Sequence, residues 1–320
     1  MAGAIEKGTL KNYRSGLKKF SDFLSSSDLS IVAPSCSSSS DLRMLISQAG
    51  VIEAFICFCF QNNLTRGTTG NYIDALKHFA TDLDGVPYFP REEVISRLLD
   101  GFQKLGKRPS PPKLGIDVIL LRRLILHVDS MDVGPDKALW KAMFAVAFFG
   151  CFRVSEFLVS EDAMKLLSYN NVRLAGDAIE FLLFKTKNNS SGSVQQVLFA
   201  PLPDDIACPV RNLLVFRSAR ASSEGSAAFF SDSSGIPVSA SRFNVMLRKA
   251  LLGLGISDTK LYSAKSFRVG AASMSYSLNM SVEDIQALGR WASTAFLYYI
   301  RAGARAVRAC GVQKRLSRVV

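Results

Sequence analysis

Hydrophobic positions recur at spacings of three and four through most of the first hundred residues, which is the pattern of amphipathic helices. Over residues 7–24, lysines and arginines alternate with the apolar positions, so this helix has one apolar and one basic face. A serine-rich stretch over residues 25–40 is typical of a loop. Three more segments show the helical periodicity, at residues 41–62, 68–83 and 91–105. We therefore expect a small all-helical domain over residues 1–105.

A short run rich in proline and cations, GKRPSPPKLG at residues 106–115, follows this domain. Proline disfavours helix in its own position and in the residue before it, so the run predicts an extended linker with a basic character. A chain of 320 residues, 48% of them hydrophobic, is long enough for two domains with separate cores. The sequence predicts the second domain over residues 116–320.

The pattern changes period inside the second domain. Helical periodicity over residues 116–128 and 137–158 gives way to β-rich runs within residues 172–202, placed around a polar turn at 188–193. Helical patterns then return, after Pro209, over residues 241–254, 264–278 and 281–288, and from 293 onward. In the last group, Ser281 and Asp284 form a helix-start signal and Gly289 a stop signal. The expected fold class is mostly α with a small antiparallel β-sheet, an α+β arrangement.

The charge balance indicates a polyanionic partner. The 39 lysines and arginines exceed the 27 acidic residues by 12, and the sequence pI is about 9.5, which favours nucleic acid ahead of an anionic membrane surface. The longest strongly apolar run, residues 142–152, is too short to cross a bilayer, and the first residues have no apolar signal core. We expect a soluble protein that is not secreted.

Several kinds of chemistry have no support in the sequence. Six cysteines are scattered along the chain and are expected to be small, reduced core residues rather than a disulfide framework. The only histidines, His78 and His127, have no ligand partner nearby, so we expect neither a metal nor any other cofactor. Nucleotide-binding and hydrolase motifs are absent from the sequence. Any catalysis must therefore use arginine, lysine, tyrosine and carboxylates.

Candidate residues gather in five short motifs of the second domain. Arg153 and Glu156 are three residues apart at the end of the buried helix, in GCFRVSE. Lys265 and Arg268 are also three apart, in KSFR, which places both on one face of a helix. Lys185 lies in EFLLFKTK, at the mouth of the predicted hairpin. The remaining candidates are Trp291, in LGRW, and Tyr299, in AFLYYIR.

In order and spacing, these motifs resemble the tyrosine recombinases, also called phage-integrase-type enzymes. The segments SFRVGAA, IQALGRW and YYIR are most similar to those of eukaryotic mobile elements of the DIRS and Crypton kind. The resemblance covers the chain from about residue 116 onward, and the first domain is similar to the family's core-binding domain in its helical character only. It implies a DNA-binding domain at residues 1–105 and a catalytic domain with a C-terminal tail at 116–320.

The resemblance also implies roles for individual residues. Arg153 and Arg268 correspond to the two arginines that clamp the phosphate. Lys185 corresponds to the hairpin lysine that protonates the leaving oxygen, and Tyr299 to the nucleophile. Trp291 takes the place of the family's histidine or tryptophan, and Glu156 that of the acid that supports the first arginine. Lys265 stands where the family most often has histidine, so proton handling there differs.

The chemistry of phosphodiester cleavage suits these residue types. Arginine binds two phosphate oxygens at once through its planar fork. A tyrosine hydroxyl becomes an effective nucleophile only where cations stabilise its phenolate. Crowded cations lower the pKa of a nearby lysine, which suits Lys185 to act as a general acid. The indole N–H of Trp291 can donate to the phosphate. Because the tyrosine linkage conserves the bond energy, neither ATP nor a divalent metal is required.

Simpler interpretations remain open for each motif. Arg153 and Glu156 could form an ordinary helix ion pair, Lys265 could be a solvent-facing helix residue, and Trp291 could be a plain core residue. Lys187 shares a strand face with Lys185 and competes with it. Tyr298 competes with Tyr299 as the nucleophile. The order of the motifs favours Lys185 and Tyr299.

The sequence therefore predicts a site-specific DNA recombinase or integrase that cuts and rejoins double-stranded DNA through a 3′-phosphotyrosine. By resemblance, four copies would act on two duplexes, with the tail at residues 301–320 docking on a neighbouring copy. A nuclear location would follow for a eukaryotic source. The alternatives are a catalytically inactive DNA-binding protein derived from such an enzyme, and a topoisomerase that uses the same tyrosine chemistry.

Overall fold

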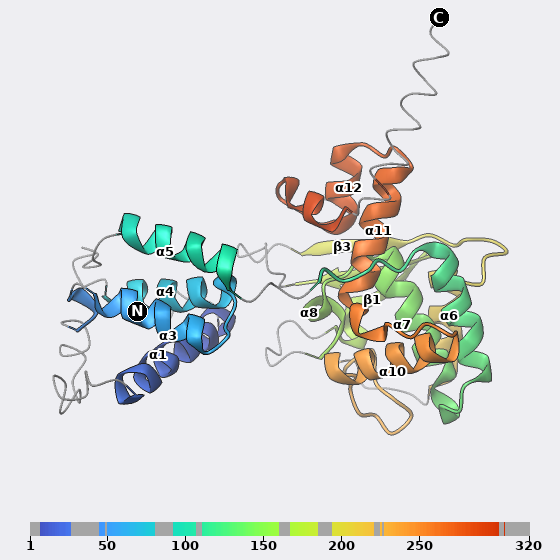
Figure 1. The fold of residues 1–320 in the computed structure, drawn as a ribbon. Coiled ribbons are helices and arrows are strands. Elements are labelled where there is room, and N and C mark those ends of the chain that lie inside the picture. The colour runs from blue at the N-terminus through green and yellow to red at the C-terminus, as the bar shows by residue number, and fades with distance from the viewer. Residues whose placement is uncertain are drawn as a thin grey trace, which may run out of the picture. The chain divides into compact units, whose positions relative to one another are not determined.

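The computed structural model describes most of the chain in two separate compact units, residues 1–110 and 111–320 (Figure 1). The described residues are 7–26, 45–48, 50–80, 92–106, 111–159, 167–184, 194–220, 225, 227–300 and 304. The division falls in the proline-rich run at 106–115, of which residues 107–110 lie outside the described residues. Each unit has its own hydrophobic cluster.

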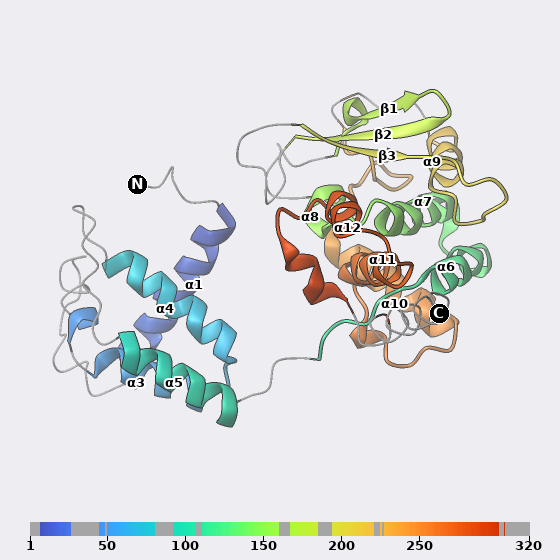
Figure 2. The ribbon, with the colours of Figure 1, turned by 90° about the horizontal axis from the view of Figure 1, so that it is seen from above.

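The first unit is built from helices that pack their apolar faces together. They are α1 (Lys7–Ser26), α3 (Val51–Gln61), α4 (Arg66–Ala80) and α5 (Glu92–Leu105), shown in Figure 2. Phe20 of α1 and Phe55 of α3 meet edge to face, 5.1 Å between ring centres, and both are fully buried. The basic face expected on α1 is exposed at Lys11, Arg14 and Lys18.

The helix expected over residues 41–62 is wrong at its beginning. A short helical turn at 45–47 precedes α3, which begins only at Val51. Gly50 has a φ of 89°, in the left-handed region that glycine enters at little cost, and this ends one segment and starts the next. The Gly50 amide donates to the Glu53 carboxylate at 3.1 Å, which caps the new helix.

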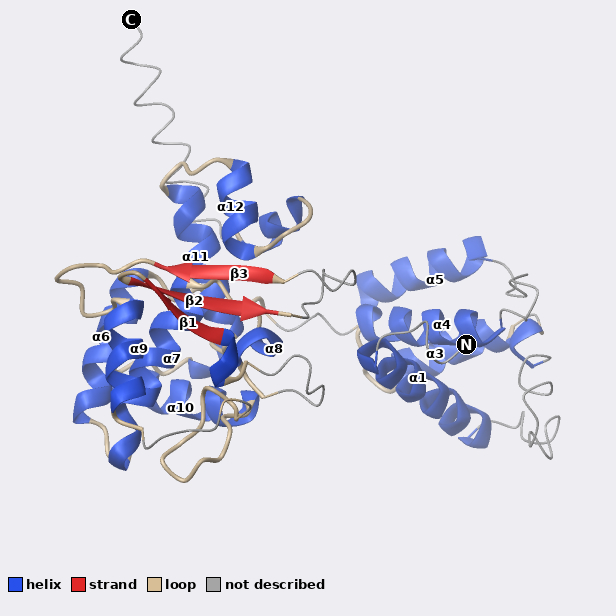
Figure 3. Cartoon of the chain, turned by 180° about the vertical axis from the view of Figure 1, so that it is seen from behind, coloured by secondary structure: helices blue, strands red, loops and turns tan. Residues whose placement is uncertain are grey.

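The second unit combines helices with a three-stranded sheet, as the period change in the sequence predicts (Figure 3). The strands β1 (Val172–Ala175), β2 (Ala178–Leu183) and β3 (Gln195–Phe199) are antiparallel, with β2 in the middle. Phe181 faces Val172 of β1 and Val197 of β3. The fold class is therefore confirmed as mostly α with a small antiparallel sheet. The polar turn expected at 188–193 lies outside the described residues.

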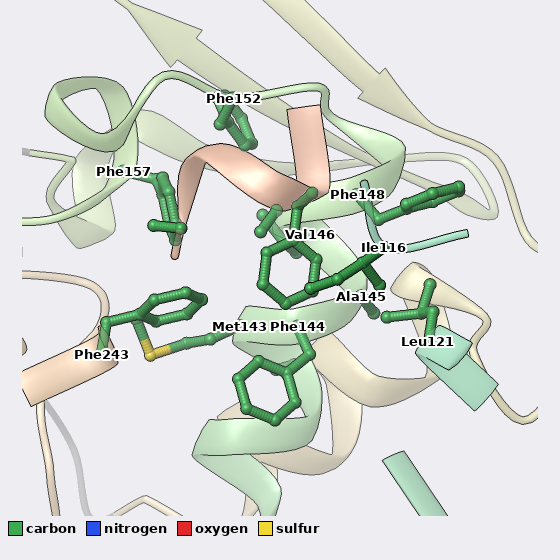
Figure 4. Close-up of a cluster of buried hydrophobic side chains, with 14 of the residues drawn as sticks. Ile116, Leu121, Met143, Phe144, Ala145, Val146, Phe148, Phe152, Phe157 and Phe243 are labelled. Atoms are coloured by element: carbon green, nitrogen blue, oxygen red, sulfur yellow. The ribbon is translucent and has the colours of Figure 1, made fainter. Parts of the chain in front are cut away.

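The helices of the second unit surround α7, which is buried over most of its length. They are α6 (Val118–Ser130), α7 (Lys137–Phe149), α8 (Val154–Phe157), α9 (Pro209–Ser218), α10 (Ala240–Gly253), α11 (Lys265–Ser277) and α12 (Val282–Gly289). Phe144 of α7 lies 5.6 Å from the ring centres of both Phe243 and Phe267. Figure 4 shows Phe152, just after α7, in the same cluster, and its ring lies 6.0 Å from that of Phe181 in the sheet. The core thus joins helices and sheet.

The single helix expected over residues 137–158 is also wrong, because it breaks after Phe149 and resumes at Val154. Cys151 adopts a φ of 46°, and the reversal turns Phe152 into the core, where 1% of it is exposed. The break leaves Arg153 in an extended conformation at the start of α8, where its backbone amide donates to Glu156 at 2.9 Å.

The C-terminal part of the described chain follows the predicted start and stop signals. Ser281 accepts a hydrogen bond from the Asp284 amide at 2.9 Å, and α12 ends at Gly289. The helix expected from residue 293 onward is a six-residue 3₁₀ helix, η6 (Thr294–Tyr299). Within the tail at 301–320, only Ala304 is described. None of the described helices is both long and apolar enough to cross a membrane.

Candidate active site

Glu156 forms the buried anionic centre of the site. Its side chain is 1% exposed and accepts from the Arg153 side chain at 2.8 Å and from the Arg153 amide at 2.9 Å. The Arg290 guanidinium donates at 2.7 Å to Oε2 of Glu156, which also accepts from the Arg153 amide, whereas the Arg153 side chain donates to Oε1. One carboxylate therefore joins two arginines that are far apart in the sequence. The ordinary helix ion pair considered for Arg153 and Glu156 describes only half of this arrangement.

Arg268 lies on the first turn of α11 and is enclosed, with 1% of its surface exposed. Its terminal nitrogens donate to the backbone carbonyls of Cys151 and Gly289, the latter at 2.6 Å. Its guanidinium carbon lies 4.0 Å from the ring centre of Trp291, within cation–π range. Arg268 thereby ties the turn between α7 and α8 to the corner that follows α12.

Tyr299, at the end of η6, lies against cations and an aromatic ring. Its ring centre is 5.3 Å from the Lys265 ammonium, 5.5 Å from the Arg268 guanidinium carbon and 5.4 Å from the Trp291 ring centre. The neighbouring Tyr298 is 86% exposed, whereas Tyr299 is only partly exposed. The two adjacent tyrosines therefore have different surroundings. Tyr299, which the sequence favoured by its motif alone, contacts Lys265, Arg268 and Trp291.

Hydrogen bonds and close packing place Tyr299 and Trp291 relative to α11. Ser273 of α11 donates through its hydroxyl to the Tyr299 carbonyl at 3.0 Å. A side chain on Gly289 would overlap the Trp291 ring, so glycine is needed for the indole to lie over the end of α12. The Trp291 amide donates to the Gln286 carbonyl at 2.9 Å. Trp291 is thus a buried core residue, as the simpler interpretation of the sequence proposed, and it also contacts Arg268.

Arg290 is the residue that sequence reasoning missed. It directly follows α12, has a left-handed φ of 54°, and its side chain is 7% exposed. Besides Glu156, it donates to the carbonyls of Gly150 at 3.0 Å and Cys151 at 3.3 Å. Its position within LGRW was visible in the sequence. No local pattern, however, relates it to a carboxylate more than a hundred residues earlier.

Burial and charge shift the ionisation of this cluster. Burial alone would raise the pKa of Glu156, but the charge of Arg290 and the hydrogen bonds from Arg290 and Arg153 outweigh it and hold that pKa below its ordinary value. Burial raises the pKa of the Cys151 thiol to about 11, so the thiol is neutral. Burial also lowers the pKa of Arg268, although an arginine stays charged at neutral pH even so.

Six of the seven predicted site residues are linked by this chain of contacts. They are Arg153, Glu156, Lys265, Arg268, Trp291 and Tyr299. Lys185 and its competitor Lys187 lie outside the described residues. In the described part of the chain, no cluster of three or more histidine, cysteine or acidic side chains could hold a metal. The site is therefore a cationic cluster around a tyrosine, with a chemistry that favours phosphate.

Comparison with known proteins identifies the fold. No protein-family model and no curated protein sequence matches the chain. Among solved structures, a Tn1549 transposon integrase in complex with transposon right end DNA matches with a TM-score of 0.60 at 16% identity, covering 99% of this chain and 96% of that one. XerH site-specific recombinase bound to its difH substrate matches with a TM-score of 0.59 at 14% identity, covering 91% and 76%.

A lambda integrase dimer bound to a core site is similar as well, with a TM-score of 0.57 at 13% identity and coverage of 95% and 72%. All three similar proteins are tyrosine recombinases or integrases, and the matches extend over both units of this chain. The small sheet and the helices around α7 agree with the same architecture. The chain therefore has the fold of the tyrosine recombinases.

Proposed function

We propose that this protein is a DNA strand transferase of the recombinase or integrase type, with Tyr299 as its nucleophile. The observation that carries the proposal is the position of the Tyr299 ring, which lies beside Lys265, Arg268 and Trp291. Positive charge next to a phenol stabilises the phenolate, and the same charge attracts a phosphodiester. The similar structures include integrases and recombinases bound to DNA, which supports DNA as the partner.

The proposed reaction conserves the number of phosphoester bonds. The phenolic oxygen of Tyr299 attacks the scissile phosphorus, a bond to phosphorus forms, and the bond from phosphorus to the 5′ oxygen breaks. The phenol proton passes to solvent, and the departing 5′ oxygen takes a proton from a lysine, Lys185 or Lys265. A 5′ hydroxyl from a second duplex then attacks the phosphotyrosine, and Tyr299 regains its proton as it leaves.

The arginines supply the charge stabilisation in this scheme. Arg153 has a side chain that is 16% exposed and is oriented by Glu156, so it can meet a phosphate arriving from solvent. Among the described residues, the buried Nε–H of Arg268 has no hydrogen-bond partner. An unpaired buried donor is costly, and a phosphate oxygen would satisfy it. Because Trp291 covers Arg268, the corner with Trp291 and Tyr299 must shift when DNA binds.

The remaining parts of the proposal follow from the resemblance. The helical first unit would bind DNA through the face with Lys11, Arg14 and Lys18, which are exposed along one side of α1. The second unit would perform the cleavage. Four copies would assemble on two duplexes through the tail at 301–320. The motifs SFRVGAA, LGRW and YYIR would place the chain among mobile-element enzymes of eukaryotes, which would act in the nucleus.

One observation favours a second candidate, a DNA-binding protein without cleavage activity. Arg268 donates both terminal nitrogens to backbone carbonyls and is enclosed, so the phosphate site is closed in this structure. Lys265 also stands where the family most often has a histidine, and none of the candidate site residues is a histidine that could handle protons. A protein that retained the fold for binding alone would keep these contacts and never open the corner.

The test begins with selection of bound sequences from random double-stranded DNA, since the target site is not known in advance. A nicked suicide duplex made from the selected site then traps the cleaved strand, and denaturing gel electrophoresis detects the covalent adduct. The proposal expects an adduct that disappears in Tyr299→Phe and persists in Tyr298→Phe, the matched control with an exposed ring. An adduct that persists in Tyr299→Phe overturns the assignment.

Two further results separate the alternatives. Selective binding without any adduct in the unmodified protein supports the non-catalytic candidate. Relaxation of supercoiled DNA without joining of two duplexes identifies a topoisomerase instead. A salt series accompanies the binding measurement, because affinity that comes from phosphate contacts falls as the salt concentration rises.

A further inference from the structure

Arg290 connects the corner that holds Tyr299 to the turn that holds Arg153. Its guanidinium donates to the carbonyls of Gly150 and Cys151, in the turn between α7 and α8, and to the carboxylate of Glu156 in α8. Its own backbone lies between Gly289 and Trp291, at the start of the corner after α12. The side chain is 7% exposed, which is less than the 16% of Arg153.

The backbone at Arg290 directs its side chain inward. A φ of 54° is uncommon for a residue with a side chain, because the Cβ atom crowds the backbone there. The guanidinium carbon lies 5.0 Å from the ring centre of Phe152, the residue that the broken helix turns into the core. Two unusual backbone positions, Cys151 and Arg290, are therefore held against each other by one side chain.

The charges of Arg153, Glu156 and Arg290 indicate a role beyond packing. Glu156 alone would neutralise Arg153, which would leave that guanidinium little net attraction for phosphate. With Arg290 on the second carboxylate oxygen, the group of two arginines and one carboxylate keeps a net positive charge. The carboxylate then fixes the direction of Arg153 without cancelling its charge.

We propose that Arg290 is a positioning residue for strand cleavage, which locks the Trp291–Tyr299 corner onto the Arg153 turn and shares Glu156 with Arg153. This inference rests on the proposed function. Arg290 itself would not contact the reacting phosphate, because its side chain is 7% exposed and both terminal nitrogens donate to backbone carbonyls or to Glu156. Its effect would pass through the placement of Tyr299 and the charge of Arg153.

The first experiment measures the corner directly and needs no catalysis. Protein labelled with 5-fluorotryptophan has two ¹⁹F resonances, from Trp140 and Trp291, and Trp140→Phe assigns them. Arg290→Met removes the charge and the hydrogen bonds while keeping an unbranched side chain. We expect it to shift or broaden the Trp291 resonance and leave that of Trp140 unchanged. An unchanged Trp291 resonance overturns the proposal.

A matched control comes from Arg220, an arginine of the same unit that lies outside this group of contacts. It donates to the Phe229 carbonyl at 2.9 Å and lies over the rings of Tyr169 and Phe216, at 5.2 Å and 5.6 Å. Arg220→Met therefore removes a comparable structural contact. We expect it to leave the Trp291 resonance and the cleavage rate per folded molecule unchanged.

The second experiment measures the rate of adduct formation on the suicide substrate at saturating DNA, with the folded fraction checked by circular dichroism. Arg290→Met should lower this rate by about 100-fold, as expected when reacting groups are displaced by about 1 Å. The DNA dissociation constant should change by less than about 3-fold, since phosphate contacts elsewhere dominate affinity. A purely structural role would lower thermal stability and leave the rate per folded molecule unchanged, which overturns the proposal.

A double-mutant cycle with Glu156→Gln tests the shared carboxylate. If Arg290 acts through Glu156, adding Arg290→Met to Glu156→Gln should cost less than about 3-fold more, because residues in one network are not additive. Additive losses overturn this part of the proposal.

If the unmodified protein forms no adduct, the proposed function fails and so does the role of Arg290 in cleavage. If adducts form and Arg290→Met cleaves normally, the function holds and only the inference fails.

Discussion

The guanidinium carbon of Arg268 lies 4.0 Å from the centre of the Trp291 ring, and both residues are buried. Arg268 also donates to the carbonyls of Cys151 and Gly289. A charged side chain that is fully enclosed is held by these carbonyls and by an aromatic face rather than by a carboxylate of its own. The stability of this part of the molecule and the proposed chemistry therefore depend on the same residue.

Replacement of Arg268 by methionine should lower both stability and cleavage. The change leaves the buried Gly289 carbonyl without its donor and the Cys151 carbonyl with only the longer bond from Arg290, and we expect the free energy of unfolding to fall by roughly 1 to 3 kcal/mol. Urea titration followed by circular dichroism measures this loss. Arg268→Lys should recover part of the stability but little of the adduct formation, because an ammonium cannot bond both carbonyls in a planar fork. An unchanged urea midpoint in Arg268→Met would contradict the prediction.

Glu156 should make the stability of the second unit depend on pH in the acid range. Because its pKa is lowered in the folded protein, it stabilises the fold above the ordinary carboxyl value of 4.5, and this contribution is lost as the pH falls through the lowered value. Wild-type protein should therefore lose more unfolding free energy on acidification below 4.5 than Glu156→Gln does. Urea titrations at a series of pH values compare the two proteins.

The same substitution should also cost stability at neutral pH. Glu156→Gln leaves two buried guanidinium groups without their shared carboxylate, which we expect to cost about 3 to 5 kcal/mol. Asp205 and Asp232, whose pKa values are also lowered, contribute equally to both proteins and cancel from the comparison. Parallel pH profiles for the two proteins would show that Glu156 is not the group that titrates.

Gly289→Ala should displace Trp291 from its place over Arg268. The added methyl group would overlap the indole ring, and we expect a loss of about 1 to 3 kcal/mol in the free energy of unfolding. The ¹⁹F resonance of a labelled Trp291 reports the displacement. Gly101→Ala is the control, because it lies within α5 and has open space at its Cβ position. This change should be neutral or stabilise by up to about 1 kcal/mol. Equal effects would refute the packing argument.

Lys265 should make cleavage independent of any histidine titration. The two histidines lie elsewhere: His78 is on α4, 5.0 Å from the Tyr13 ring, and His127 is on α6, bonded to Ser130. Because no histidine is among the candidate site residues, the rate of adduct formation should show no step near the usual imidazole pKa of about 6.5.

The variant Lys265→His tests this interpretation by adding an imidazole beside Tyr299. If the positive charge at this position matters, its rate should fall as the pH rises through about 6.5, where the imidazolium loses its proton. Lys260→His is the matched control, since Lys260 lies in the 3₁₀ helix η5 (Thr259–Leu261) before α11 and the same substitution there adds an imidazole outside the cluster. A step that appears in both variants, or in neither, would contradict the role given to the Lys265 charge.

Local signals in the sequence were sufficient for the order and type of the elements. Apolar spacings of three and four predicted the helices, the change of period predicted the sheet, and Ser281 and Gly289 marked the limits of α12. These features depend on residues within one or two turns of each other, where propensity and periodicity act directly. The errors at Gly50 and at residues 150–153 occur where the backbone enters the left-handed region, which periodicity does not register.

The sequence by itself determined which residue types are present for phosphate chemistry and that Lys265 and Arg268 share a turn of one helix, because helical geometry depends on neighbouring residues. Only the tertiary structure decided that Arg290 completes the Glu156 group, that Tyr299 lies beside Lys265 and Arg268, and that Arg268 is enclosed. Those relationships join α8, α11 and the corner after α12. They arise from packing between segments far apart in the chain, which no local pattern encodes.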